Sequence, residues 1–232
     1  MNIGSRLEAI GSLVPQGSIL ADIGTDHAYL PVWLLQQGKI ERAIAGDIAE
    51  GPCLAAQNTV SMYGMKDKVE VRLGSGLQVL RSGEVNVIAI AGMGASTMID
   101  ILTADIALAE EAETLILQPM AGAPSLRTWL CQHGWQLEDE KLVSEGKHLY
   151  EIIVAVRGTS EAYTRAQLEI GPILIAKGHP LLQQQFTKVL TGYHRLLQNM
   201  AKSEQATASS KYADLTQLVQ EVEELANDTY HK

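Results

Sequence analysis

The sequence has few cysteines, few aromatic residues and an excess of negative charge. Its 232 residues include two cysteines, Cys53 and Cys131, and one phenylalanine. Two cysteines are too few for a disulfide scaffold and their spacing matches no metal motif, so we predict no metal site. Acidic residues outnumber basic ones by 27 to 18, for a net charge of -9. This excludes a generally basic nucleic-acid-binding protein but leaves room for a local basic patch.

Long hydrophobic runs are also missing. No window approaches the roughly 18 continuous apolar residues of a membrane span, and the first six residues contain no apolar signal-peptide core. We therefore predict a cytoplasmic protein that makes no membrane contact. A hydrophobic content of 46% is still typical of a globular chain.

Residues 1–157 alternate between apolar segments of strand length and segments with helical spacing. This alternation predicts an α/β fold with a parallel sheet covered on both faces. The last two strands are joined by the short segment 144–149, which predicts a terminal hairpin with one antiparallel strand. The predicted strands are 18–23, 43–47, 69–73, 85–91, 114–118, 135–143 and 150–156, and the predicted helices are 29–37, 51–63, 94–105 and 124–133.

Residues 158–232 show a different pattern. Two long stretches place apolar residues at i, i+3, i+4 and i+7, and the polar segment 204–210 separates them. We predict an antiparallel helical hairpin packed as a short coiled coil, and hence two domains, 1–157 and 158–232. The first domain carries 11 basic and 19 acidic residues, and the second carries 7 basic and 8 acidic residues. The second domain should therefore repel a polyanion less than the first.

Most of the chemical information lies where the first predicted strand ends. Gly24 stands where the chain must turn and where a ligand can approach the backbone. Asp22, Asp26 and His27 surround it, and the further glycines of a dinucleotide fingerprint are missing. The carboxylates would repel a pyrophosphate but suit the cationic amino and sulfonium groups of S-adenosylmethionine. The alternative is that Asp22 and Asp26 only cap the next helix or bind backbone amides.

The ends of other strands are also acidic or rich in glycine. Asp47 ends the second strand, where a carboxylate can bind ribose hydroxyls or, alternatively, cap the next helix. Gly74 and Gly76 follow the third strand and permit approach of an adenine ring, although a plain turn explains them equally well. The fourth strand ends in Gly92 and Gly94.

Together these segments resemble the bacterial tRNA (adenine-22-N1)-methyltransferase family. The resemblance rests on ADIGTDHAYLP (21–31), GDI (46–48), AGMG (91–94), LQPM (117–120) and YEII (150–153). It implies a Rossmann-like class I methyltransferase domain followed by the helical hairpin. It also implies S-adenosylmethionine as cofactor and tRNA as partner, with N1 of the adenine at position 22 as methyl acceptor.

The resemblance also implies where the cofactor lies. Its methionine part is expected on Gly24, Asp26 and His27, in addition to Asp22 from the local chemistry. The ribose is expected at Asp47 and Ile48, the adenine at Ser75, Gly76 and Leu77, and the methyl group beside Ala91, Gly92, Met93 and Gly94.

Adenine N1 is already a nucleophile, so the enzyme must hold the base and stabilise the developing positive charge rather than supply a strong base. We predict Asp26 as the catalytic carboxylate. Glu151 is a second candidate, which could instead form an ion pair.

The target base must leave the RNA stack and enter a pocket. The residues predicted to bind it are Tyr29, Gln118, Pro119, Met120 and Tyr150, and for the two tyrosines core packing is an equal alternative. The cations predicted to bind RNA include Arg6, Arg127, Lys188, Arg195 and Lys202, of which the last three are seven residues apart and therefore share a helix face.

Two other functions stay open: methylation of a small molecule or protein, and a non-catalytic cofactor-binding scaffold.

Overall fold

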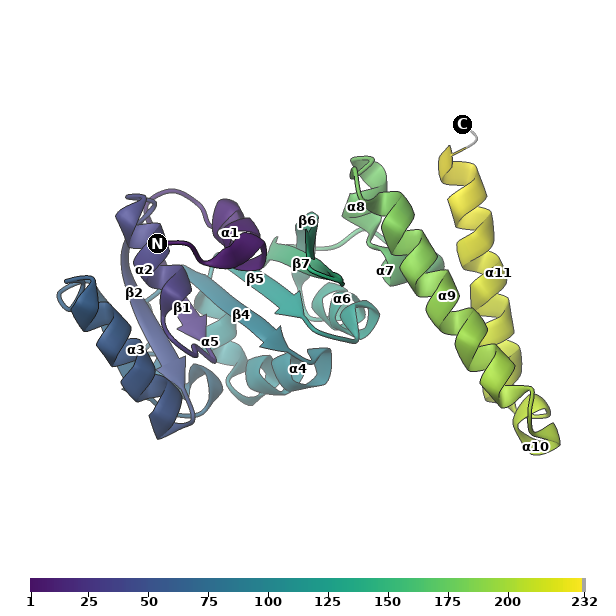
Figure 1. Ribbon diagram of the computed structural model, residues 1–232, viewed down its shortest axis with the longest axis horizontal. Coiled ribbons are helices and arrows are strands. Elements are labelled where there is room, and N and C mark those ends of the chain that lie inside the picture. Colours follow the sequence, from purple (N-terminus) through teal and green to yellow (C-terminus); the bar gives the residue numbers. More distant parts are fainter. Residues whose placement is uncertain (231–232) are drawn as a thin grey trace. The chain divides into compact units, whose positions relative to one another are not determined.

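The computed structural model describes residues 1–230 and divides the chain into two compact units, Met1–Ser160 and Glu161–Lys232 (Figure 1). The division lies three residues after the predicted boundary. Within the described residues, no helix combines the length and apolar character needed to span a bilayer.

The first unit is built on a seven-stranded sheet with the order β3-β2-β1-β4-β5-β7-β6. The first five strands are parallel, whereas β7 is antiparallel to both β5 and β6. This confirms the predicted Rossmann-like sheet with an antiparallel terminal hairpin. The strands are β1 (Ser18–Ile23), β2 (Ile40–Asp47), β3 (Val69–Leu73), β4 (Val87–Met93), β5 (Thr114–Pro119), β6 (Trp135–Glu145) and β7 (His148–Arg157).

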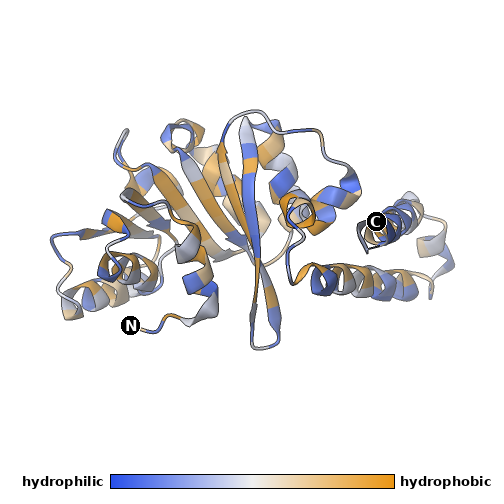
Figure 2. Cartoon of the chain, turned by 90° about the horizontal axis from the view of Figure 1, so that it is seen from above, coloured by the Kyte–Doolittle hydropathy of each residue, from blue (hydrophilic) through white to orange (hydrophobic). Residues whose placement is uncertain are grey.

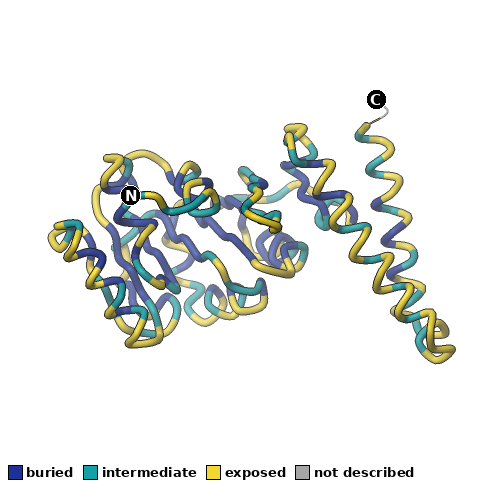
Figure 3. The backbone as a smooth tube through the Cα atoms, in the orientation of Figure 1, coloured by how far each residue is buried: buried dark blue, intermediate teal, exposed yellow. Residues whose placement is uncertain are grey.

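Helices cover both faces of this sheet. Contacts group α1 (Gly4–Leu13), α2 (Tyr29–Gln36) and α3 (Glu50–Met62) on one face, and α4 (Ala95–Ala104), α5 (Ile106–Glu111) and α6 (Ala123–Gln132) on the other. The strands between them are rich in apolar residues (Figure 2) and are largely buried (Figure 3). Helix α1 was not predicted. It packs against β6 and α2 and places Arg6 at the carboxyl edge of the sheet.

The chain order reverses beside β1, where β2 and β4 lie on its two sides. Each parallel strand beside this point ends in a loop on the same edge. Such a switch point leaves a crevice between diverging loops, and open α/β sheets bind their ligands there. The fold therefore directs attention to the ends of β1, β2 and β4.

The second unit contains helices and no strand as far as Tyr230, its last described residue. It contains α7 (Arg165–Ile170), α8 (Pro172–Ala176), α9 (Leu182–Met200), α10 (Glu204–Thr207) and α11 (Ser210–Tyr230). Helix α11 packs against α9 and α7, and Arg165 makes a bidentate ion pair with Asp214 of α11. The predicted connection between the long helices includes α10. One expectation was wrong: Lys202 lies beyond the end of α9, so it does not continue the helical row of Lys188 and Arg195.

Candidate active site

The loop after β1 is shaped by two left-handed residues. Gly24 has φ of +76° and Ala28 has φ of +53°, a conformation that is unfavourable for alanine. The N–H groups of Gly24 and Thr25 both donate to the carbonyl of Gly46, which ties the loop to the end of β2. The Thr25 hydroxyl accepts the N–H of Ala28 at 3.0 Å. The helix-capping alternative for the aspartates is therefore wrong, since α2 starts from Ala28 without a side-chain cap.

A side chain at Gly24 would strain the backbone and displace the end of Met93. A Cβ atom there would lie 1.9 Å from the terminal methyl of Met93, in addition to the strain of its positive φ. Met93 reaches this place because β4 contains a bulge: Ala91 pairs with Gln118 and Met93 with Pro119, so Gly92 is an extra residue with φ of +79°. Bulges of this kind re-aim side chains beside functional sites.

A cavity of about 340 Å³ lies over this loop. Asp22 lies in its floor and is only 8% exposed. Burial raises the pKa of the Asp22 carboxyl to about 6; a hydrogen bond from Thr25 opposes the shift and the nearby charge of Asp47 adds to it. The lining residues are Arg6, Leu7, Asp22, Gly24, Thr25, Asp26, His27, Ala28, Tyr29, Leu30, Ala91 and Gly92.

A second cavity of about 200 Å³ lies at the ends of β2 and β3 and shares Gly24 with the first. Asp47 lies in this cavity, and one of its carboxylate oxygens accepts the N–H of Ala49 at 2.8 Å. The carboxylate thus contributes to the start of α3 and has a second oxygen for a ligand. The lining residues are Ile23, Gly24, Gly46, Asp47, Ile48, Gly74, Ser75, Gly76, Met93, Thr97 and Ile101.

The two cavities fit an elongated ligand with a cation at one end and a nucleoside at the other. The buried Asp22 and the exposed Asp26 line the first cavity. The second is lined by Asp47, by the glycines at 74 and 76 and by the exposed Ile48. Gly24 joins them and offers bare backbone to a ligand that crosses from one to the other. The residues present therefore fit S-adenosylmethionine.

The rim on the β5 side is built by residues from α1, β5 and β7. Arg6 donates to the buried Gln118 side chain at 2.7 Å and lies over the Tyr150 ring, 5.6 Å from its centroid. Met120 is 53% exposed at the same edge, while Pro119 is buried.

Tyr29 lines the first cavity. It is 41% exposed, which excludes the core-packing alternative for this residue, and its ring stacks on His27 with centroids 4.9 Å apart. The His27 ring also lies 3.3 Å from the Asp26 carboxylate, whose side chain is 78% exposed.

Two predicted cofactor residues lie outside both cavity linings. Leu77 is fully buried in the core, so its side chain cannot contact a ligand, and Gly94 forms the N-cap of α4 with open space where a Cβ would stand. Packing against Val79 explains Gly74, since a Cβ there would lie 2.9 Å from that side chain. Six lining residues were given no role from the sequence. Thr25, Ala28 and Leu30 belong to the motif at 21–31, whereas Leu7, Thr97 and Ile101 lie outside every motif.

Arg127 is not a surface cation, contrary to the prediction. It is fully buried and makes ion pairs with Glu140 at 2.5 Å and with Glu151 at 2.8 Å. These residues join α6 to β6 and β7. The ion-pair alternative for Glu151 is thus the one that the structure supports.

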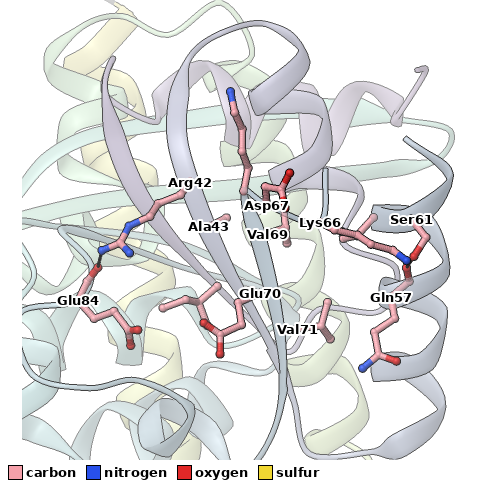
Figure 4. Close-up of a pocket in the computed structure, with 13 residues that line it drawn as sticks. Arg42, Ala43, Gln57, Ser61, Lys66, Asp67, Val69, Glu70, Val71 and Glu84 are labelled. Carbon is pink, nitrogen blue, oxygen red and sulfur yellow. Dashed lines mark hydrogen bonds between the residues drawn. The ribbon is translucent and has the colours of Figure 1, made fainter. Parts of the chain in front are cut away.

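A larger cavity of about 550 Å³ lies elsewhere, at the free edge of β3 (Figure 4). Its lining mixes cations such as Lys66 and Lys68 with acids such as Glu70, and Arg72 already binds Glu70 and Glu84. It lies away from the switch point and contains none of the motif residues. The volume of a cavity alone therefore does not identify the candidate active site. Among residues 1–230, no group of three or more His, Cys, Asp or Glu side chains could hold a metal ion.

Comparisons with known proteins identify the family. A family model described as a methyltransferase domain matches residues 3–153. The tRNA (adenine(22)-N(1))-methyltransferase of Bacillus subtilis is 33% identical over 98% of this chain and 94% of its own length. The chain belongs to this methyltransferase family. The resemblance seen in the sequence is thereby confirmed.

Solved structures of family members are similar over nearly the whole chain. The B. subtilis M1A22 tRNA methyltransferase TrmK has a TM-score of 0.86 and 32% identity, covering 95% of this chain and 98% of that one. Sp1610 of Streptococcus pneumoniae, in complex with S-adenosyl-L-methionine, has a TM-score of 0.84 and 36% identity, covering 95% and 99%. These relatives favour RNA methylation over the two alternatives that the sequence left open.

Proposed function

We propose that this protein transfers a methyl group from S-adenosylmethionine to N1 of the adenine at position 22 of tRNA. The observation that carries the proposal is the end-to-end similarity to a tRNA (adenine(22)-N(1))-methyltransferase in a chain whose motifs after β1, β2 and β4 line two cavities that share Gly24. We also infer a cytoplasmic location, because tRNA and the cofactor are both found there.

The cofactor brings an electrophilic methyl group on a sulfonium. We assign the cationic amino group to the cavity that Asp22 and Asp26 face, and the ribose hydroxyls to Asp47. Charge-assisted hydrogen bonds of this kind are stronger than neutral ones. The bare backbone at Gly24 lets the ligand pass between the two groups of acids.

The acceptor adenine needs positioning rather than deprotonation. Its N1 has an in-plane lone pair, so the protein must hold that atom in line with the methyl group and exclude water. Tyr29, which lines the first cavity, and Met120, which follows β5, both present exposed apolar surface and are suited to contacting a base that has left the RNA helix. Arg6, held by Gln118, supplies a cation beside the same entrance.

Asp26 is the proposed catalytic carboxylate. The methylated base carries positive charge, and a fixed negative charge near it lowers the barrier. Because the Asp26 side chain is 78% exposed, water screens it until cofactor and base cover it. We expect Asp26→Asn to reduce the single-turnover rate more than the cofactor affinity. A rate equal to wild type would leave Asp26 no role in the chemical step.

The deciding experiment is transfer of tritiated methyl groups to unmodified tRNA, followed by mass analysis of the nucleosides. We expect 1-methyladenosine in tRNA with adenine at position 22 and none in a matched transcript with guanine there. Small-molecule and protein acceptors serve as parallel controls. Methyl transfer to one of them but not to tRNA would refute the proposal, and so would cofactor binding without any transfer.

The helical unit is proposed to contact the body of the tRNA. Lys188 and Arg195 lie on exposed positions of α9, seven residues apart, and can follow a phosphate backbone. Lys202, placed in the turn after α9, extends this surface only if the RNA reaches the end of the hairpin. Binding that depends on these residues should weaken with added salt.

A further inference from the structure

The β6–β7 hairpin extends beyond the sheet. Pairing between β5 and β7 runs as far as Leu117 with Ile153, whereas β6 and β7 continue to pair as far as Glu145 with His148. Residues 148–152 of β7 and residues 141–145 of β6 therefore form a two-stranded ribbon. It lies on the edge of the sheet where the parallel strands end. Figure 2 shows this ribbon projecting from the sheet. Such a ribbon is marginally stable alone and needs support.

Helix α1 supplies this support on one face of the ribbon. Lys141 of β6 donates to the Ser12 hydroxyl at 2.9 Å, and the Arg6 N–H donates to the Glu145 carboxylate at 3.2 Å. The ribbon is thus held in one orientation relative to the cavity that Arg6 lines. A braced ribbon can bind a partner with little loss of conformational freedom.

The same face presents a row of rings and a guanidinium, which we call the His148 row: His148, Tyr150 and Arg6. The His148 and Tyr150 rings are 5.8 Å apart with an interplanar angle of 37°, and the Arg6 guanidinium lies 5.6 Å from the Tyr150 centroid. His148 is exposed and Tyr150 and Arg6 are half-buried. The row therefore leads from the tip of the ribbon to the mouth of the first cavity.

We propose that the His148 row binds an unstacked nucleotide of the RNA that neighbours the methylated adenine. This inference rests on the proposed function, since it concerns the same entrance. Extrusion of the target base leaves its neighbour with an exposed face, and unpaired bases stack on aromatic rings and on arginine. Histidine at the tip, tyrosine in the middle and arginine at the cavity provide such a platform.

The charge around the row fits a nucleic acid. Arg6 lies at its inner end and Lys147 at the turn of the ribbon. The one acid opposite His148 in the β6–β7 pairing is Glu145, and its carboxylate already accepts the Arg6 N–H. An RNA phosphate near the row therefore meets cations and a carboxylate that is engaged with the backbone.

The test uses the full-length protein with His148→Ala, His148→Phe and the control His133→Ala. His133 is a matched control because it is also exposed and stacks on an aromatic ring, that of Trp129 at 4.4 Å, but lies just before the start of β6, at the other end of that strand. We expect His148→Ala to raise the KM for tRNA roughly tenfold, the effect of losing one stacking contact. We expect His148→Phe to restore it and His133→Ala to leave it unchanged. The affinity for S-adenosylmethionine should be equal in all four proteins.

A competition experiment separates base stacking from phosphate attraction. A single-stranded oligonucleotide with the sequence around position 22 should inhibit wild type more strongly than His148→Ala, while the same sequence in a duplex should inhibit both equally. An unchanged KM for tRNA in His148→Ala would overturn the inference while the proposed function stands, and a row that serves a protein partner would give this result. If wild type methylates no RNA, the proposed function fails. The inference then survives only if tRNA binding still weakens in His148→Ala.

Discussion

Asp22 offers a direct test of how the cofactor site is built, because its carboxyl is buried without a cationic partner in the described site. Its pKa is about 6 in the folded protein and 3.8 in the unfolded chain. The folded state therefore binds the proton more tightly, and stability falls as the pH rises through the window between these values and stays low above it. A shift of about two pKa units corresponds to roughly 3 kcal/mol at neutral pH.

Replacing this carboxylate by a neutral amide should remove that cost. We expect ligand-free Asp22→Asn to be more stable than wild type by about 1–3 kcal/mol at pH 8, since some of the gain is lost with the Thr25 hydrogen bond. The melting temperature should rise by roughly 3–8 °C, and the difference should shrink towards pH 4.

Calorimetric melting curves between pH 4 and pH 8 measure this difference. Saturating S-adenosylmethionine should reverse the order at pH 8, because the cofactor stabilises the protein that binds it more tightly. A stability difference that does not change with pH, or a variant that is less stable at pH 8, would refute the argument that burial of a charge dominates at Asp22.

Three further substitutions test other parts of the site. Gly24→Ala should weaken cofactor binding in calorimetric titration, because its Cβ would strain the backbone at φ of +76° and displace the end of the Met93 side chain, whereas Gly51→Ala, with open space and ordinary φ, should bind normally. Asp47→Ala should weaken cofactor binding about ten- to a hundredfold by the same measurement, through loss of charge-assisted hydrogen bonds; unchanged affinity would exclude the ribose assignment. Arg127→Met should destabilise the protein by about 3–5 kcal/mol in denaturant unfolding, because a fully buried glutamate loses its partner. A loss below about 1 kcal/mol would contradict that reasoning.

The spacing of apolar residues, together with the acids and glycines that follow the strands, was sufficient to predict the sheet. The apolar runs 18–23 and 69–73 coincide with β1 and β3, and the acids and glycines that follow the strands mark the edge where the cavities lie. Helix α1 was missed because it precedes the first strand and so lies outside the strand–helix alternation that predicted the other helices, and it packs against β6. Such tertiary support leaves little trace in the local sequence.

Arg127 shows a second limit of prediction from sequence. A lone arginine in a predicted helix is usually on the surface. Its partners are Glu140 and Glu151, which lie on different strands of the terminal hairpin and become neighbours only when the sheet forms. Their pairing depends on long-range contacts, and neither periodicity nor motif spacing could reveal it.

The charge of the first unit constrains how it can hold RNA. Residues 1–157 carry a net charge of -8, so their long-range field repels a polyanion. At physiological salt this field is screened over about 8 Å, and contacts within that range decide the interaction. The contacts that we propose are Arg6 at the cavity mouth, the rings of Tyr29, Tyr150 and His148, and the exposed Met120. Stacking and shape, rather than bulk charge, should therefore select the RNA at the catalytic unit, and beyond the local cations such as Arg6 the salt-sensitive attraction should come from the nearly neutral helical unit.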